Sequence, residues 1–294
     1  MQPRHVLLAV ILSVFWGLNF VVMTIGLHGF PPVFMAAARF FLAALPALFL
    51  PRPAVPWKTL IALSGTLFVG QFALSYPAMA LGMPPGLMSI VLQVQAFITI
   101  GIAAVLLHER PHSRQIAGGA VTLIGLAVIA ATVGVNGVTV PGLLLTLASA
   151  VSWAIGNVII RRMPPAETLP LISWLSLLAI LPLLALSLIF EGPARIADVF
   201  LHVSWPSVAA VFYIAFVSTT FGYGSWAVLL KMYPAPVVAP FSLLVPVTGT
   251  ISAALLLGER FGPARVVGMV LILVGLAVLV LRWRRSAVPA PAAP

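Results

Sequence analysis

Long apolar stretches run along almost the whole chain, broken by short connections that are polar or rich in Pro and Gly. Most stretches approach 20 residues, and about 20 helical residues span the roughly 30 Å hydrocarbon core of a bilayer. They lack the alternating polarity of the roughly 10-residue strands in a membrane barrel. The pattern therefore predicts ten membrane-spanning helices, at Val6–Leu27, Pro32–Leu50, Thr59–Leu81, Gly86–Leu107, Arg114–Val133, Val140–Ile160, Thr168–Phe190, Pro206–Leu230, Pro236–Leu257 and Pro263–Leu281.

One stretch of this pattern occurs twice. The segment LLHERPHSRQIAGGAVTLIGLAV at 106–128 returns as LLGERFGPARVVGMVLILVGLAV at 256–278, 150 residues later and without a gap. A repeat near half the chain length indicates two copies of one structural unit. We therefore predict a first five-helix repeat over residues 1–133, a second over 134–282, and a disordered cytoplasmic tail at 283–294.

Together with this pattern, composition and charge placement predict an all-α integral membrane protein and its orientation in the membrane. Hydrophobic residues make up 62% of the chain and charged residues 7%, which excludes a water-soluble fold. With the N-terminus inside, eleven Lys or Arg residues fall in cytoplasmic segments and three in outer ones, as the positive-inside rule requires. The net charge of +10 then fits a lipid bilayer as partner rather than a nucleic acid.

The orientation of the two repeats follows from the number of helices in each. Because five is odd, the second repeat must be inverted relative to the first, a plan that recurs in secondary transporters. We therefore expect two inverted five-helix repeats in a bacterial inner membrane, with both termini in the cytoplasm.

Several segments resemble one family of membrane proteins. They are FWGLNF at 15–20, ARFFLAALPALFL at 38–50, LLHER and LLGER closing the fourth and ninth spans, and GLAV ending the fifth and tenth. In this order the chain resembles the drug/metabolite transporter superfamily, and within it the ten-helix EamA type, over nearly its whole length. The resemblance implies a secondary transporter, and the aromatic amino-acid exporter branch is the most similar part of the family.

Polar and aromatic side chains near the middle of six spans are the candidate substrate contacts. Polar groups at that depth should face a cavity or one another rather than lipid. The six spans are corresponding members of the two repeats, although each side chain could instead hold two helices together. Trp16 and Trp153, from corresponding helices, could stack on a flat substrate between them. The candidates are Trp16, Asn19, Gln71, Tyr76, Gln93, Gln95, Trp153, Asn157, Thr219, Tyr223 and Ser242.

Arg39 is a charged residue well inside a predicted span. It lies about seven residues in, which is roughly 10 Å deep at 1.5 Å per residue. A charge at that depth indicates function by default. The alternative, which the resemblance slightly favours, is that Arg39 snorkels or bonds helix-end carbonyls.

HERPH at 108–112 matches the H-E-x-x-H pattern of zinc proteases. That chemistry needs both histidines on one face of a continuous helix, and Pro111 breaks a helix at this point. The second copy, GERFG at 258–262, keeps Glu-Arg and loses both histidines. We therefore expect no metal, no cofactor and no enzyme, and keep an intramembrane metalloenzyme as an alternative. The repeated Glu-Arg pairs are interpreted as turn-closing pairs, and the repeated glycines as close helix contacts.

Ionisable groups are missing from the middle of the spans, and this bears on energy coupling. All five carboxylates and all five histidines fall in loops or near span ends. Proton-coupled transporters commonly use intramembrane Asp, Glu or His, and the chain has no Walker A motif for ATP. The sequence therefore predicts a uniporter. Because both halves are fused in one chain, it should work as a monomer. By alternating access it should export small neutral or zwitterionic metabolites, mainly amino acids and including aromatic ones. A drug or cation exporter of the same fold is the alternative.

Overall fold

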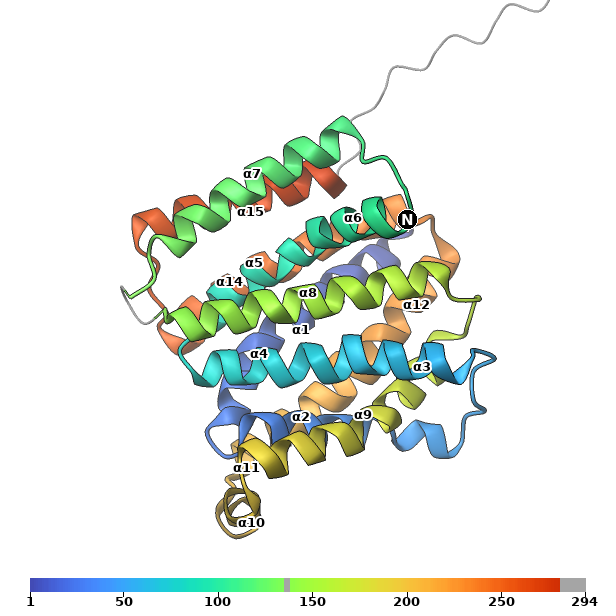
Figure 1. The fold of residues 1–294 in the computed structure, drawn as a ribbon, viewed down its shortest axis with the longest axis vertical. Coiled ribbons are helices and arrows are strands. Elements are labelled where there is room, and N and C mark those ends of the chain that lie inside the picture. The colour runs from blue at the N-terminus through green and yellow to red at the C-terminus, as the bar shows by residue number, and fades with distance from the viewer. Residues whose placement is uncertain (135–137, 281–294) are drawn as a thin grey trace, which may run out of the picture.

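The computed structural model describes residues 1–134 and 138–280, and the described residues form helices and connections without a strand. In Figure 1, α7 (Ser113–Ala130) and α15 (Pro263–Val280) lie at one edge of the molecule and α9 (Thr168–Phe190) lies towards the other, while α1 (Pro3–Leu27) runs at a slant between them. Nine helices in this part of the chain are long and apolar enough to cross a bilayer. The second predicted span is shorter and covers Pro32–Leu48.

The first repeat contains five spans, three of them built from more than one helical segment. Proline stands in the first turn of α1, α2 and α5. Proline lacks an N–H, but in the first turn of a helix that group would have no partner within the helix. The segments are α1 (Pro3–Leu27), α2 (Pro32–Ala43) with η1 (Leu45–Leu48), α3 (Trp57–Leu63) with η2 (Ser64–Gly70) and α4 (Gln71–Ala80), α5 (Pro85–Val91) with η3 (Leu92–Val94) and α6 (Gln95–Leu106), and α7 (Ser113–Ala130).

The second repeat has the same order of spans. Its first helix, α8, is capped by the Thr139 hydroxyl, which accepts a 3.0 Å hydrogen bond from the N–H of Gly142. The segments are α8 (Val140–Arg162), α9 (Thr168–Phe190), α11 (Trp205–Phe212) with η4 (Tyr213–Phe221) and α12 (Gly222–Met232), α13 (Ala235–Val238) with η5 (Ala239–Leu243) and α14 (Leu244–Leu257), and α15 (Pro263–Val280).

The repeated glycines bring α7 and α15 into direct backbone contact. A Cβ added at Gly118 would lie 2.8 Å from the carbonyl oxygen of Gly275, and one at Gly125 would lie 2.7 Å from that of Gly268. Residue numbers rise along one helix as they fall along the other, so the two helices are antiparallel. The fifth and tenth spans therefore run in opposite directions, as an inverted pair of repeats requires (Figure 1).

Departures from regular α-helix also occur at corresponding places in the two repeats. The third span contains the π-helical segment η2 and the eighth contains the π-helical segment η4. The fourth and ninth spans contain the 3₁₀ segments η3 and η5. Such interruptions release backbone groups from the regular hydrogen-bond ladder and are frequent at functional sites.

Three expectations from the sequence need comment. The connection from Glu191 to Trp205 contains a helix, α10 (Pro193–His202). The apolar pattern did not predict this helix, because polar residues interrupt its apolar ones. Arg265, one of the three Lys and Arg residues counted with the outer segments, is a buried residue of α15. The predicted disordered tail at 283–294 lies outside the described residues.

Candidate functional site

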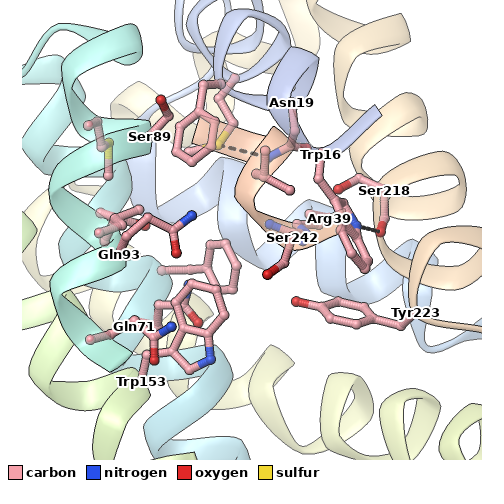
Figure 2. A pocket seen from close by; sticks show the side chains of 18 of the residues that line it. Trp16, Asn19, Arg39, Gln71, Ser89, Gln93, Trp153, Ser218, Tyr223 and Ser242 are labelled. Atoms are coloured by element: carbon pink, nitrogen blue, oxygen red, sulfur yellow. Dashed lines mark hydrogen bonds between the residues drawn. The ribbon is translucent and has the colours of Figure 1, made fainter. Parts of the chain in front are cut away.

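A cavity of about 290 Å³ is lined by side chains from both repeats (Figure 2). Its walls come from α1, α2, α4, α5, η3 and α6 of the first repeat and from α8, η4, α12, η5 and α14 of the second. All four irregular spans contribute to it: Gln93 lies in η3, Ser242 in η5 and Ser218 in η4, and Gln71 directly follows η2. The corresponding interruptions of the two repeats thus meet around one space.

Most of the side chains predicted from the sequence line this cavity. Trp16 and Trp153, which come from corresponding helices, lie on opposite sides of it in Figure 2. The predicted residues that line the cavity are Trp16, Asn19, Gln71, Gln93, Gln95, Trp153, Tyr223 and Ser242.

The other three predicted residues lie one layer further out and hold cavity residues in place. Tyr76 and Thr219 are fully buried, and each accepts hydrogen bonds from the guanidinium of Arg39. Asn157 donates a 2.8 Å hydrogen bond to Oε1 of Gln95, which links α8 to α6. These three residues therefore fit the alternative role of joining helices.

Arg39 is the only charged residue among those that line the cavity. Its Nε and Nη2 donate to Oγ1 of Thr219 at 3.1 and 2.9 Å, and its Nη1 donates to the Tyr76 hydroxyl at 3.1 Å. The guanidinium carbon lies 4.2 Å from the centre of the Phe72 ring and 5.1 Å from that of Phe40. Arg39 therefore points into the protein and does not snorkel to the membrane surface.

Trp16 is fixed in place by the irregular segment η4. Its indole N–H donates a 2.9 Å hydrogen bond to the carbonyl oxygen of Ser218. A Cβ at Gly222 would lie 2.7 Å from the same indole nitrogen, so glycine permits the approach. The ring also contacts Tyr223 and Trp226, with centroids 5.6 and 5.3 Å apart. An aromatic wall thus covers one side of the cavity.

Two polar atoms near the cavity have no hydrogen-bond partner among the described residues. They are Oδ1 of Asn19 and Oγ of Ser75, both buried. The amide nitrogen of Asn19 has only a weak acceptor, the Met23 sulfur at 3.2 Å. Buried polar groups are normally satisfied, so unpaired ones in a cavity wall indicate places for a polar ligand.

The sequence reasoning missed the apolar part of the wall and one small polar residue. Phe20, Met23, Phe72, Met88 and Trp226 line the cavity but cannot be told from lipid-facing residues by type. Ser89 also lines it, and a serine in a membrane helix can instead bond its own backbone, as Ser89 does to the carbonyl oxygen of Gly86. Ser75 and Ser218, which belong to the same mid-span polar set in the sequence as Gln71 and Tyr223, line the cavity as well.

The glutamates of the two repeated Glu-Arg turns have different partners. Beyond α14, the carboxylate of Glu259 accepts hydrogen bonds from the backbone N–H of Gly86 at 2.8 Å and of Leu87 at 3.4 Å, and so caps α5. Burial raises the pKa of Glu259 above its usual value, although these bonds and the charge of Arg265 lower it.

The first repeat does not form the corresponding cap. Glu109 instead pairs with Arg161 at 3.0 Å, at an exposed position. Val237, which occupies the place of Leu87 in the second repeat, donates its N–H to the carbonyl oxygen of Pro234. The two ends therefore differ although their sequences correspond.

The HERPH segment lies in the connection between α6 and α7, outside either helix. His108 has a left-handed backbone with φ of 54°, and His112 is the N-cap of α7. The two histidines therefore do not share a helix face, which is the arrangement that the zinc-protease pattern requires.

Comparison with known proteins agrees with this architecture. The model of the EamA-like transporter family matches residues 4–131 and again residues 140–281. Proteins named probable amino-acid metabolite efflux pump, from Salmonella typhimurium and Escherichia coli, are each 42% identical. The former covers 97% of both chains, the latter 97% of this chain and 98% of its own.

A solved crystal structure has the same fold. It matches 92% of this chain and 95% of its own with a TM-score of 0.60, at 20% sequence identity. The family model matches once in each half of the chain, and the described residues contain the apolar helices of a multi-pass membrane protein. This chain belongs to the EamA-like transporter family.

Proposed function

We propose that this protein exports small neutral or zwitterionic metabolites, chiefly amino acids including aromatic ones. The observation that carries the proposal is the make-up of the cavity wall, in which amides, hydroxyls and indoles surround one cation and none of the lining residues carries a carboxylate. Its volume of about 290 Å³ lies at the lower end of the roughly 300–1,000 Å³ typical of small-molecule sites. The names of the two 42% identical relatives support amino-acid metabolites as cargo.

The same wall argues against a drug or cation exporter. A cationic substrate would enter a space that already holds the charge of Arg39 and meets no lining carboxylate. Like charges repel strongly where water is scarce, so such a substrate would bind poorly. A zwitterion avoids this cost because its carboxylate can face the guanidinium.

Alternating access is supported by the difference between the two Glu-Arg turns. At one end Glu259 ties α14 to the start of α5, whereas at the other end Glu109 is paired with Arg161. Two inverted repeats can exchange such states, so that each end of the cavity is tied shut in turn. In this structure the carrier would then be closed at the end where Glu259 lies. The charge distribution assigns that end to the outside of the membrane.

A uniport mechanism is supported by the groups that line the cavity. None of the lining residues is Asp, Glu or His, the side chains that commonly carry protons within membranes. The substrate's own gradient would then drive export. Because one chain supplies both repeats and every wall of the cavity, the proposed working unit is a monomer in a bacterial inner membrane, with both termini in the cytoplasm.

The test is uptake by the purified protein in liposomes, with labelled aromatic, small neutral, basic and acidic amino acids and a lipophilic cation. We expect uptake of the aromatic and small neutral amino acids. Trp16→Ala should reduce aromatic uptake severalfold, because an aromatic contact in the cavity is lost. Trp205→Ala, which removes an indole that is 83% exposed, is the matched control. Uptake of the cation alone would contradict the proposal.

A further inference from the structure

The charge of Arg39 is buried with neutral partners. Its side chain is 3% exposed, and its hydrogen bonds go to the hydroxyls of Thr219 and Tyr76. The ion pairs found among the described residues, Arg161 with Glu109 and His202 with Asp198, are both at exposed positions. Burying an arginine without an anion is costly, so its presence in the cavity wall needs an explanation.

The guanidinium also keeps hydrogen-bonding capacity. Each terminal nitrogen carries two N–H groups, and Nη1 and Nη2 each make one bond, to Tyr76 and to Thr219. One N–H therefore remains on each. A pair of terminal N–H groups is what a guanidinium uses to hold both oxygens of a carboxylate.

The neighbours of Arg39 hold it in place without neutralising it. Oγ1 of Thr219 accepts from both Nε and Nη2 and donates to the carbonyl oxygen of Ile214 at 2.8 Å, a bond made within the π-helical segment η4. The Phe72 ring, 4.2 Å from the guanidinium carbon, covers one face. A planar donor fixed in this way is ready for an anion before the anion arrives.

An acceptor that lacks a donor lies in the same cavity. Oδ1 of Asn19 is buried and has no hydrogen-bond partner among the described residues, and Asn19 and Arg39 both line the space drawn in Figure 2. A carboxylate can satisfy the free donors of Arg39, and an ammonium can satisfy the free acceptor of Asn19. The wall thus offers complementary groups to the two charged ends of an amino acid.

We infer that Arg39 is the carboxylate-binding residue of the transport site, with Thr219 and Tyr76 as its positioning residues. The inference rests on the proposed function in naming amino acids as cargo, but it makes a separate claim, that a free carboxylate is the feature recognised. A cavity selective for a carboxylate should reject, by about ten- to a hundredfold, the same molecule with its carboxylate replaced by a carboxamide, which is the range for a hydrogen bond to a charged group.

The experiment compares two sets of probes on the reconstituted full chain: L-phenylalanine, L-phenylalaninamide and 3-phenylpropionate, and L-alanine, L-alaninamide and propionate. Binding is measured as ligand-induced thermal stabilisation, and competition is measured against uptake of the parent amino acid. In the native protein we expect at least one acid to bind more tightly than its amide by the factor above. In Arg39→Gln and Arg39→Lys this ratio should fall towards one, because Lys lacks the planar pair of donors.

The matched control is Arg195→Gln, which removes an arginine from the exposed surface of α10 and should keep the ratio. Should Arg39→Gln fail to fold, the ratio in the native protein still decides, together with Tyr76→Phe and Thr219→Val, which keep the charge and should lower the ratio partly. A purely structural Arg39 would change stability without changing the ratio.

The outcomes separate the two proposals. If amino acids and their amides bind and move equally well, the carboxylate site is wrong while amino-acid transport stands. If 3-phenylpropionate or propionate binds and depends on Arg39, while neither amino acid binds or moves, the carboxylate site stands and amino-acid transport is wrong. If no acid of either set binds the native protein, both are wrong.

Discussion

The carboxylate of Glu259 accepts a 2.8 Å hydrogen bond from the backbone N–H of Gly86, so the turn after α14 caps the start of α5. Glu109, at the same place in the first repeat, pairs with Arg161 instead. The second repeat thus forms this helix cap, whereas the first repeat, whose sequence corresponds, does not. This difference can be tested, because the chain contains no cysteine and a single introduced one is a unique label.

Removing the carboxylate of Glu259 should loosen that end of the cavity. Glu259→Ala leaves the N–H groups of Gly86 and Leu87 without their acceptor, a loss of about 1 kcal/mol or about a fivefold change in population. With a cysteine at Ser242 in the cavity, we expect faster labelling by an impermeant reagent from the outside. Asp198→Ala, at an exposed carboxylate of α10, is the matched control. Equal rates in both variants would show that the cap does not close the cavity.

The pH dependence of this labelling follows from the raised pKa of Glu259. Burial in the capped state raises that pKa above its ordinary value of 4.5, so the capped state binds a proton more tightly than a released state with Glu259 in water. Lowering the outer pH should therefore favour the capped state and slow labelling at Ser242, and raising it should reverse the effect. Glu259→Gln should label slowly at every pH. Faster labelling in acid would contradict this sign.

Contact between α7 and α15 should depend on the absence of side chains at the repeated glycines. A Cβ at Gly118 would press on the carbonyl oxygen of Gly275, and backbone moves less easily than a side chain. Gly118→Ala should lower the free energy of unfolding by about 1–3 kcal/mol, the usual cost of overpacking. Gly101→Ala is the matched control, because a Cβ there meets nothing within 4 Å. Thermal unfolding in detergent measures both, and equal melting temperatures would contradict the packing.

Orientation in the membrane is tested at the repeated turns themselves. Cysteines placed singly at Arg110 and Arg260 should react from opposite sides, with Arg110 in the cytoplasm. The positive-inside distribution and the antiparallel α7 and α15 both lead to this expectation. Reaction of both cysteines from one side would rule out the inverted arrangement, and reaction of Arg260→Cys from the cytoplasm alone would reverse the orientation.

Much of the fold could be predicted from the sequence. In lipid a helix must form its backbone hydrogen bonds internally, so a spanning segment can be recognised as a long apolar stretch. The internal repeat added the inversion, which the contacts of Gly118 with Gly275 reproduce. The shortened second span and α10 could not be predicted. Length and polarity do not show where a span changes to a 3₁₀ helix, as the second span does in η1, or where a connection forms a helix of its own, as α10 does.

The cavity could be predicted only in part. Depth and polarity identified Trp16 and Gln93, but the same criteria also selected Tyr76 and Thr219, which lie behind Arg39. A sequence shows that a side chain is polar and deep, but whether its partner is a ligand or another helix depends on packing. The interruptions in η2 and η4 carry no residue signature either, since a π-helical turn arises from how neighbouring helices fit together.

The most direct measurement is counterflow in liposomes that contain only this protein and no ion gradient. Vesicles preloaded with unlabelled L-phenylalanine are diluted into a trace of labelled L-phenylalanine, and the experiment is repeated with L-alanine. A carrier that alternates between two states and needs no coupled ion should accumulate label transiently above its outside concentration at symmetric pH, without any imposed pH gradient. Absence of accumulation for both amino acids, or accumulation that appears only when a proton gradient is imposed, would contradict an amino-acid uniporter.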